Sequence, residues 1–317
     1  MVIKNIQEMK KVFILLIAGI LGSTSVVLAQ QDAQYTQYMY NTQVVNPAYA
    51  GSRDALSFAG LYRSQWVGLD GAPKTATFSV NTPIKIKNVG LGLSFVRDEI
   101  GPSEETFINI DYSYTIQTSA FGKLAFGLKT GVNMINIDFR KLNIGDEGDI
   151  FENNINNRIK LQIGAGIFYY TDRFYAGFSV PNFLESQYFD ETSLENPDAY
   201  FISERNHFYA ITGYVFELSP DIKFKPAVLG KLVTGAPLQV DVSANLLFNE
   251  KLTLGAAYRW SAALSAMVGF QLSDSLMLGF AYDQETTELA RYNSGSYEFF
   301  IRYEIFKPER IFSPRFF

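Results

Sequence analysis

The chain has 317 residues, a net charge of −5, one His and no Cys. Its pI near 5.1 gives no electrostatic reason to expect nucleic-acid binding, and the lack of Cys excludes disulfides and thiolate metal sites. Phe and Tyr are abundant, at 27 and 19 residues, yet the mean hydropathy is only +0.01. This value is too low for a bundle of membrane helices and suits a β-barrel, in which only alternate residues meet lipid.

Residues 1–29 predict a cleaved secretory signal peptide. Lys10-Lys11 precede an apolar run at residues 12–21, and the segment ends in Val27-Leu28-Ala29, which is the order of a basic region, an apolar region and a small-residue cleavage site. The alternative is a single transmembrane anchor, but glycines and hydroxyl residues at 19–25 leave the apolar stretch short for a span of about 20 residues. We therefore expect export, and no later segment is apolar enough for a membrane helix.

Residues 30–52 form a polar segment without strand alternation. We expect it to fold into the lumen of a barrel or across its periplasmic mouth, where amide and phenol groups would pair with inward-facing charges. The alternative is a loosely ordered periplasmic leader, as is common at chain termini. The candidate plug residues of this segment are Tyr35, Gln37, Tyr38, Tyr40 and Asn46.

Residues 53–306 predict an all-β, transmembrane, antiparallel up-and-down β-barrel. Apolar residues alternate with small or polar ones over about 9–14 positions at a time, and turn residues separate these stretches. Near the carboxyl end, for example, Leu252, Leu254 and Tyr258 would share one face, and Thr253 and Arg259 the other. About fourteen strands are expected, near residues 54–63, 74–82, 89–99, 105–116, 122–137, 158–170, 173–181, 206–218, 222–234, 237–248, 251–261, 263–272, 276–283 and 295–305.

Three features favour a membrane barrel over a soluble sandwich, whose strands also alternate. Tyr, Phe and Trp gather near strand ends on the apolar face, as an interfacial girdle requires. The opposite face carries Gly and Ala as well as charges, which suits a curved wall around a filled lumen. The long connections (141–157, 182–205 and 284–294) all follow odd-numbered strands, which predicts long loops outside the cell and both chain ends in the periplasm.

Several blocks carry a family resemblance: NPAYAGS within residues 31–54, LYRSQWVGLDGAPKT at 61–75, VGLGLSFVRDEIGPSEET at 89–106 and SPRFF at 313–317. With these blocks the chain resembles the PorP/SprF family of Bacteroidota outer-membrane proteins. The resemblance implies a role in type IX secretion, either as a component of the secretion machine or as a dedicated partner of a large secreted adhesin.

Candidate partner-binding residues lie in the expected outer loops. The loop SQWVGLDGAP at 64–73 contains Trp66, which would either meet a secreted partner or, as we favour, cap the barrel rim. Loops as long as 182–205 commonly bind ligands, and the candidates in the two loops are Trp66, Leu69, Asp70, Phe183, Tyr188, Phe189 and Tyr200. The acidic loop 141–157 lacks the ligand spacing of an EF-hand, so solvated charge is favoured over calcium binding.

No residue pattern predicts a catalytic, cofactor or metal site. His207 is the only imidazole that could serve as a general base, and the chain contains no GxSxG nucleophile motif. Charges on the inward face, among them Arg259, Glu298 and Arg302, would line a channel or, as we favour, form ion pairs that fill a plugged barrel. The tail 307–317 contains prolines that break strand pairing and is expected in the periplasm.

The leading expectation is a non-enzymatic outer-membrane barrel of type IX secretion that binds, anchors or helps to export a secreted adhesin through its C-terminal domain. One alternative is a structural component of the secretion or gliding machine that contacts periplasmic or lipoprotein subunits. Another is a passive or hydrophobic-solute channel, for which a barrel of about fourteen strands is also suited.

Overall fold

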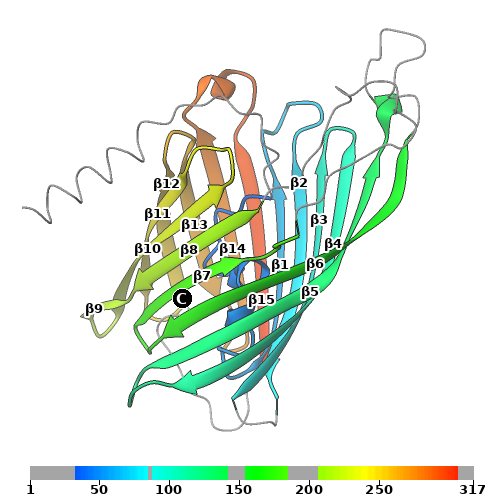
Figure 1. The fold of residues 1–317 in the computed structure, drawn as a ribbon. Coiled ribbons are helices and arrows are strands. Elements are labelled where there is room, and N and C mark those ends of the chain that lie inside the picture. The colour runs from blue at the N-terminus through cyan, green and yellow to red at the C-terminus, as the bar shows by residue number, and fades with distance from the viewer. Residues whose placement is uncertain (1–32, 85–87, 142–153, 185–205, 306–317) are drawn as a thin grey trace, which may run out of the picture.

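In the computed structural model, residues 33–84, 88–141, 154–184 and 206–305 are described. They form one antiparallel sheet that closes on itself (Figure 1). The predicted signal peptide, the tail 307–317 and the candidates Tyr188, Phe189 and Tyr200 lie outside the described residues.

The strands follow one another around the wall in chain order, and β15 pairs with β1 to close it. Their bounds are β1 (Leu56–Ser64), β2 (Lys74–Pro83), β3 (Val89–Ile100), β4 (Ser103–Gln117), β5 (Lys123–Ile137), β6 (Ile155–Tyr170), β7 (Phe174–Val180), β8 (His207–Tyr214), β9 (Phe216–Ser219), β10 (Ile222–Val233), β11 (Gln239–Phe248), β12 (Leu252–Arg259), β13 (Ala263–Gln271), β14 (Leu276–Glu285) and β15 (Ser296–Ile305).

The predicted fourteen-strand barrel is confirmed, although one strand is divided. β8 and β9 both pair with β10 and are separated only at Val215, so together they fill one position in the wall. The structure therefore divides the strand expected at 206–218. At the break, the backbone N–H of Val215 donates to the carbonyl of Arg173 in the turn before β7.

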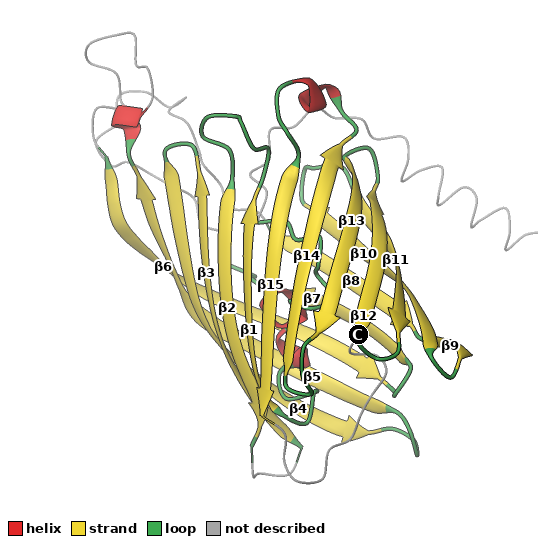
Figure 2. Ribbon diagram, turned by 180° about the vertical axis from the view of Figure 1, so that it is seen from behind, coloured by secondary structure: helices red, strands yellow, loops and turns green. Residues whose placement is uncertain are grey.

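The two ends of the barrel differ as predicted. The longest connections join β5 to β6, β7 to β8 and β14 to β15, and all lie at one end (Figure 2). The opposite end has short turns, such as those between β9 and β10 and between β11 and β12. We call these the loop end and the turn end. By the asymmetry of outer-membrane barrels, the loop end faces the outside of the cell.

The two faces of the wall also follow the predicted alternation. In β15, Tyr297, Phe299 and Ile301 point outward and are 40–56% exposed, whereas Phe300 and Arg302 point inward and are at most 5% exposed. Such alternation arises because successive side chains of a strand point to opposite faces. The outer face is thus apolar and aromatic, and the inner face carries most of the charge.

Helical structure is limited to single turns in the described residues. α2 (Thr42–Val45) and η1 (Pro47–Tyr49) lie inside the barrel, where Figure 2 shows them behind the wall, and η2 (Phe139–Lys141) and η5 (Glu288–Arg291) lie in connections at the loop end. None of the described helices is long and apolar enough to cross a membrane.

Candidate functional site

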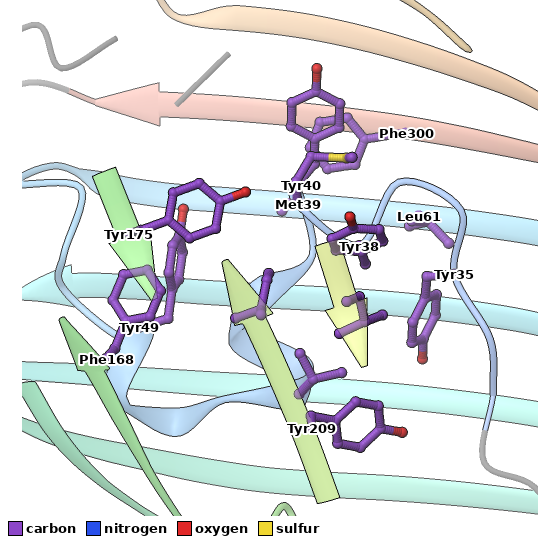
Figure 3. Packing of buried hydrophobic residues seen from close by; sticks show 14 of the residues in the cluster. Tyr35, Tyr38, Met39, Tyr40, Tyr49, Leu61, Phe168, Tyr175, Tyr209 and Phe300 are labelled. Carbon is purple, nitrogen blue, oxygen red and sulfur yellow. The ribbon is translucent and has the colours of Figure 1, made fainter. Parts of the chain in front are cut away.

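The lumen of the barrel contains the N-terminal segment, residues 33–55. Its side chains from Tyr35 to Ala50 are buried almost throughout, and the close view in Figure 3 shows Tyr35, Tyr38, Tyr40 and Tyr49 packed among residues of the surrounding strands. The segment runs from the loop end to the turn end, where β1 begins. The expectation that both chain ends lie in the periplasm is therefore wrong for the described start of the chain, because the segment enters from the loop end.

At the loop end, an ionic clamp fixes the start of the segment. Arg63 of β1 donates to Asp283 of β14 at 2.6 Å and to Glu298 of β15 at 3.2 Å, and all three side chains are at most 1% exposed. The Thr36 hydroxyl donates to Asp283 at 2.6 Å, and it accepts from Arg63 at 2.9 Å. Backbone N–H groups of Thr36 and Gln37 donate to the Glu298 carboxylate at 2.9 and 2.7 Å. The clamp satisfies buried charges with both side-chain and backbone groups, as their burial demands.

In the middle of the lumen the contacts are aromatic. Tyr40 stacks on Phe300 of β15 with ring centroids 5.0 Å apart (Figure 3), and the cations of Lys225 and Arg302 lie 5.5 and 5.7 Å from its ring centre. The Tyr38 hydroxyl lies 3.2 Å from that of Ser243. These contacts join Tyr38 to β11 and Tyr40 to β10 and β15.

Nearer the turn end, an amide side chain joins the segment to β2 and β4. Gln43 donates to Asp111 of β4 at 3.1 Å and accepts from Asn81 of β2 at 2.9 Å. Lys129 of β5 donates to the Val44 carbonyl at 2.8 Å and also lies 3.4 Å from Asp111. A single buried carboxylate thus connects two strands of the wall to the segment.

Around η1, the segment approaches the wall closely. Asn46 donates to the Ile167 carbonyl of β6 at 3.0 Å, and its side-chain oxygen accepts from the Ala48 N–H at 3.0 Å. A Cβ added at Gly127 of β5 would lie 2.1 Å from the Ala48 nitrogen, and one at Gly166 of β6 would lie 2.2 Å from the Asn46 oxygen. Glycine at these wall positions leaves room for the backbone of the segment.

At the turn end, the segment is joined to three strands before it becomes β1. Ser113 of β4 donates to the Ala50 carbonyl at 2.6 Å, and the Gly51 N–H donates to Asn81 at 3.2 Å. Arg53 forms a two-bond ion pair with Glu304 near the end of β15, and the Nη2 bond measures 2.9 Å. Both mouths of the barrel therefore hold the segment by hydrogen bonds or ion pairs.

The residues expected in the lumen are all buried inside the barrel. Tyr35, Gln37, Tyr38, Tyr40, Asn46, Glu298 and Arg302 make the contacts described above or lie in the same cluster. Arg259 of β12 donates to Asp241 at 2.8 Å and to the Tyr35 carbonyl at 3.5 Å.

The sequence-based selection missed several of the most heavily bonded residues. Arg63, Asp283 and Lys225 are buried at 1% exposure, and Thr36 and Gln43 at 2%. Strand alternation places Arg63 and Asp283 on the inward face, so the sequence pattern could have identified these two residues. Thr36 and Gln43 lie in a segment without periodicity, and no sequence signal distinguishes them from their polar neighbours.

At the loop end, Trp66 packs on the rim. Its indole N–H donates to Glu285 of β14 at 2.7 Å, and its backbone N–H donates to Ser296 of β15 at 3.1 Å. Its φ of +45° is the left-handed conformation that non-glycine residues adopt rarely. The neighbouring candidates Leu69 and Asp70 are half-buried and exposed, respectively. The structure thus joins Trp66 to the barrel rim and leaves Asp70 at the surface.

Strand pairing between β6 and β7 is short compared with the length of β6. β7 pairs with β6 only from Tyr170↔Tyr175 to Ala165↔Val180, after which Phe183 donates its N–H to the Ile163 carbonyl at 2.7 Å. β6 continues to Ile155 towards the loop end (Figure 1), and no described strand pairs with that stretch on the side away from β5. We call the β6 residues 155–164 the β6 edge.

The β6 edge is apolar on its outward face. Ile159 and Leu161 are 64% and 67% exposed, and the candidate Phe183 beside the edge is 48% exposed. A sheet edge offers backbone donors and acceptors to another extended chain. The edge thus combines a strand-pairing surface with exposed apolar side chains.

Residues that would support catalysis or metal binding do not gather in the described part of the chain. His207 begins β8, is 6% exposed and stacks with Tyr209 at 6.4 Å between ring centroids. The described residues contain no group of three His, Asp or Glu that could hold a metal ion.

Similar solved structures include the CymD monoaromatic hydrocarbon channel (10% identity, TM-score 0.49, covering 89% of this chain and 96% of that chain). They also include Omp33 of Acinetobacter baumannii (11% identity, TM-score 0.47, 80% and 100%) and a FadL homologue of Pseudomonas aeruginosa (13% identity, TM-score 0.44, 84% and 93%). The search of curated proteins found no match.

The model of the type IX secretion system membrane proteins PorP/SprF matches residues 27–303, which confirms the resemblance carried by the sequence blocks. Family and fold are those of a secretion-system membrane protein rather than of an enzyme, and partners within that machinery are implied. The chain is an outer-membrane β-barrel and belongs to the PorP/SprF family of the type IX secretion system.

Proposed function

We propose that this barrel is a non-enzymatic docking protein of type IX secretion. It binds a secreted adhesin through the C-terminal domain of the adhesin and holds it at the cell surface or helps its export. The observation that carries the proposal is the filled lumen: residues 33–55 occupy the interior and are bonded to the wall from one mouth to the other. A partner therefore meets the rim and the outer wall rather than a pore.

A filled lumen also argues against a passive or hydrophobic-solute channel. To open a path, the segment would have to leave the clamp, and each hydrogen bond to a buried charged group contributes about 1.5–3 kcal/mol. Thr36 and Gln37 make such bonds to Asp283 and Glu298, whereas the ion pairs of Arg63 join wall residues and stay in place. Displacement of the whole segment would add the loss of its aromatic and amide contacts.

The β6 edge is the part of the wall best suited to a protein partner. An extended peptide can add a strand to an open sheet edge, with backbone hydrogen bonds for affinity and alternate side chains for specificity. Phe183 and Leu184, which are 48% and 37% exposed, lie where β7 leaves this edge.

The proposal is tested by affinity purification from the native outer membrane followed by mass spectrometry. We expect a large secreted protein to co-purify with the wild-type barrel and to be depleted with Phe183→Ala. Phe121→Ala is the matched control, because Phe121 is also an exposed Phe, at 78%, but lies in the β4–β5 turn at the opposite end. Equal recovery with both variants would remove Phe183 from the docking surface.

The same purification separates the alternatives. Recovery of periplasmic or lipoprotein subunits of the machine without a secreted protein would support the structural-component function. Steady conductance of the purified barrel in a lipid bilayer, without any protein partner, would support the channel function. Either result would contradict the proposed docking role.

A further inference from the structure

The direction of the N-terminal segment determines from which side of the membrane it enters the barrel. Residues 34–37 form hydrogen bonds with wall residues near the loop ends of their strands. Gln34 donates to Gln239, the first residue of β11, at 3.1 Å, and the Tyr35 carbonyl accepts from Arg259, the last residue of β12. Thr36 and Gln37 are held by the clamp at the end of β14 and the start of β15.

The other end of the segment lies at the turn end. Gly51 bonds to Asn81 near the end of β2, and Arg53 bonds to Glu304 near the end of β15. β1 then starts at Leu56 and returns to the loop end, where Ser64 is paired with Tyr297. The chain thus crosses the barrel twice before its first loop: once through the lumen and once in the wall.

The segment occupies the lumen from the contact of Gln34 at the loop end to that of Arg53 at the turn end. Ala33, the first described residue, therefore lies at the loop end of the segment.

We propose that the N-terminal segment enters the barrel at its outer mouth, so that Ala33 and Gln34, which are half-buried, are accessible from the cell surface. The outer docking surface then includes these two residues together with the loop 65–73, which contains the rim residue Trp66. A secreted partner would meet the amide group of Gln34 in the outer mouth. This extends the proposed docking function, but the topology can be tested without any partner.

The lack of Cys in the sequence makes a labelling test direct. A Ser-Cys-Ser insertion before Ala33 is probed with a membrane-impermeant maleimide, first on intact cells and then after permeabilisation of the outer membrane. Asp70→Cys, in the exposed loop 65–73, is the outer control, and Asp221→Cys, in the exposed turn between β9 and β10, is the periplasmic control. Heat-modifiable migration on a gel shows that each variant is folded.

We expect the insertion to be labelled on intact cells to the level that it reaches after permeabilisation, as for Asp70→Cys. Labelling only after permeabilisation, as for Asp221→Cys, would overturn the proposal while leaving partner capture unaffected. If neither condition labels the insertion, a longer Gly/Ser linker carrying the same Cys decides the side, because the linker emerges at the mouth where the chain enters. Labelling of Asp70→Cys only after permeabilisation would invert the orientation and contradict the docking proposal as well.

Discussion

The β15–β1 seam and the β6–β7 boundary differ in how completely the strands pair. At the seam, pairing is continuous from Leu56↔Ile305 to Ser64↔Tyr297, and two buried arginines, Arg53 and Arg63, reach across it to carboxylates of β15. At the β6–β7 boundary, pairing covers less than half of β6. The barrel is thus held by ion pairs where its two ends meet, whereas no described strand pairs with the β6 edge on the side away from β5.

This difference has a physical cause. The seam must hold a segment that enters β1 directly, so its inward charges are paired with each other and with the backbone of that segment. At β6, the segment contacts the half of the strand that pairs with β7, near Gly166.

The largest effect is expected at the clamp behind the seam. Arg63→Ala leaves Asp283 and Glu298 buried without their cation, and we expect a loss of about 3–5 kcal/mol in the free energy of unfolding. The urea midpoint of the folded barrel, followed by gel migration, measures this loss. Arg97→Ala is the control, because Arg97 pairs with Glu99 and Glu104 at 47% side-chain exposure, and exposed pairs contribute about 0–1 kcal/mol. Equal losses would contradict the clamp.

A smaller effect is expected where the segment touches the wall. Gly127→Ala places a Cβ within 2.5 Å of Pro47 and Ala48 backbone atoms, and such overpacking costs about 1–3 kcal/mol. Gly230→Ala is the control, since its Cβ would have no neighbour nearer than 3.9 Å. Unfolding midpoints of both variants give the comparison. A Gly127→Ala barrel as stable as Gly230→Ala would mean that the segment does not press against β5.

The smallest effect is expected at the rim. Trp66→Phe removes the hydrogen bond to Glu285 but keeps an aromatic ring, and we expect a loss of about 1 kcal/mol because the site is partly exposed. The other Trp of the chain, Trp260, is 63% exposed in the turn after β12, so Trp260→Phe should change the unfolding midpoint less. The reverse order would show that the loop 65–73 is not fixed by this bond.

The sequence predicts the wall much better than the lumen. Alternation identified which face of each strand points inward, because each strand repeats with a period of two, and loop lengths identified the loop end. The extent of β6 and the break at Val215 were not predicted, since both depend on pairing with neighbours. The candidates Tyr188, Phe189 and Tyr200 remain predictions.

The contacts of the lumen could not be predicted in the same way. Arg63 meets Asp283 and Glu298, which are 220 and 235 residues away in the chain, and this meeting depends on closure of the barrel. The direction of the N-terminal segment was predicted wrongly, because loop parity describes strands and says nothing of a chain that runs through the lumen. Polar composition alone indicated that residues 30–52 belong with the inward charges.

The central claim is that residues 33–55 fill the lumen, and single-channel recording in planar lipid bilayers tests it most directly. We compare the wild-type barrel with a variant that lacks residues 33–50, after gel migration has shown that both are folded. The wild-type barrel should show no steady conductance, and the deletion should open a stable pore. Equal conductance of the two barrels would contradict the account.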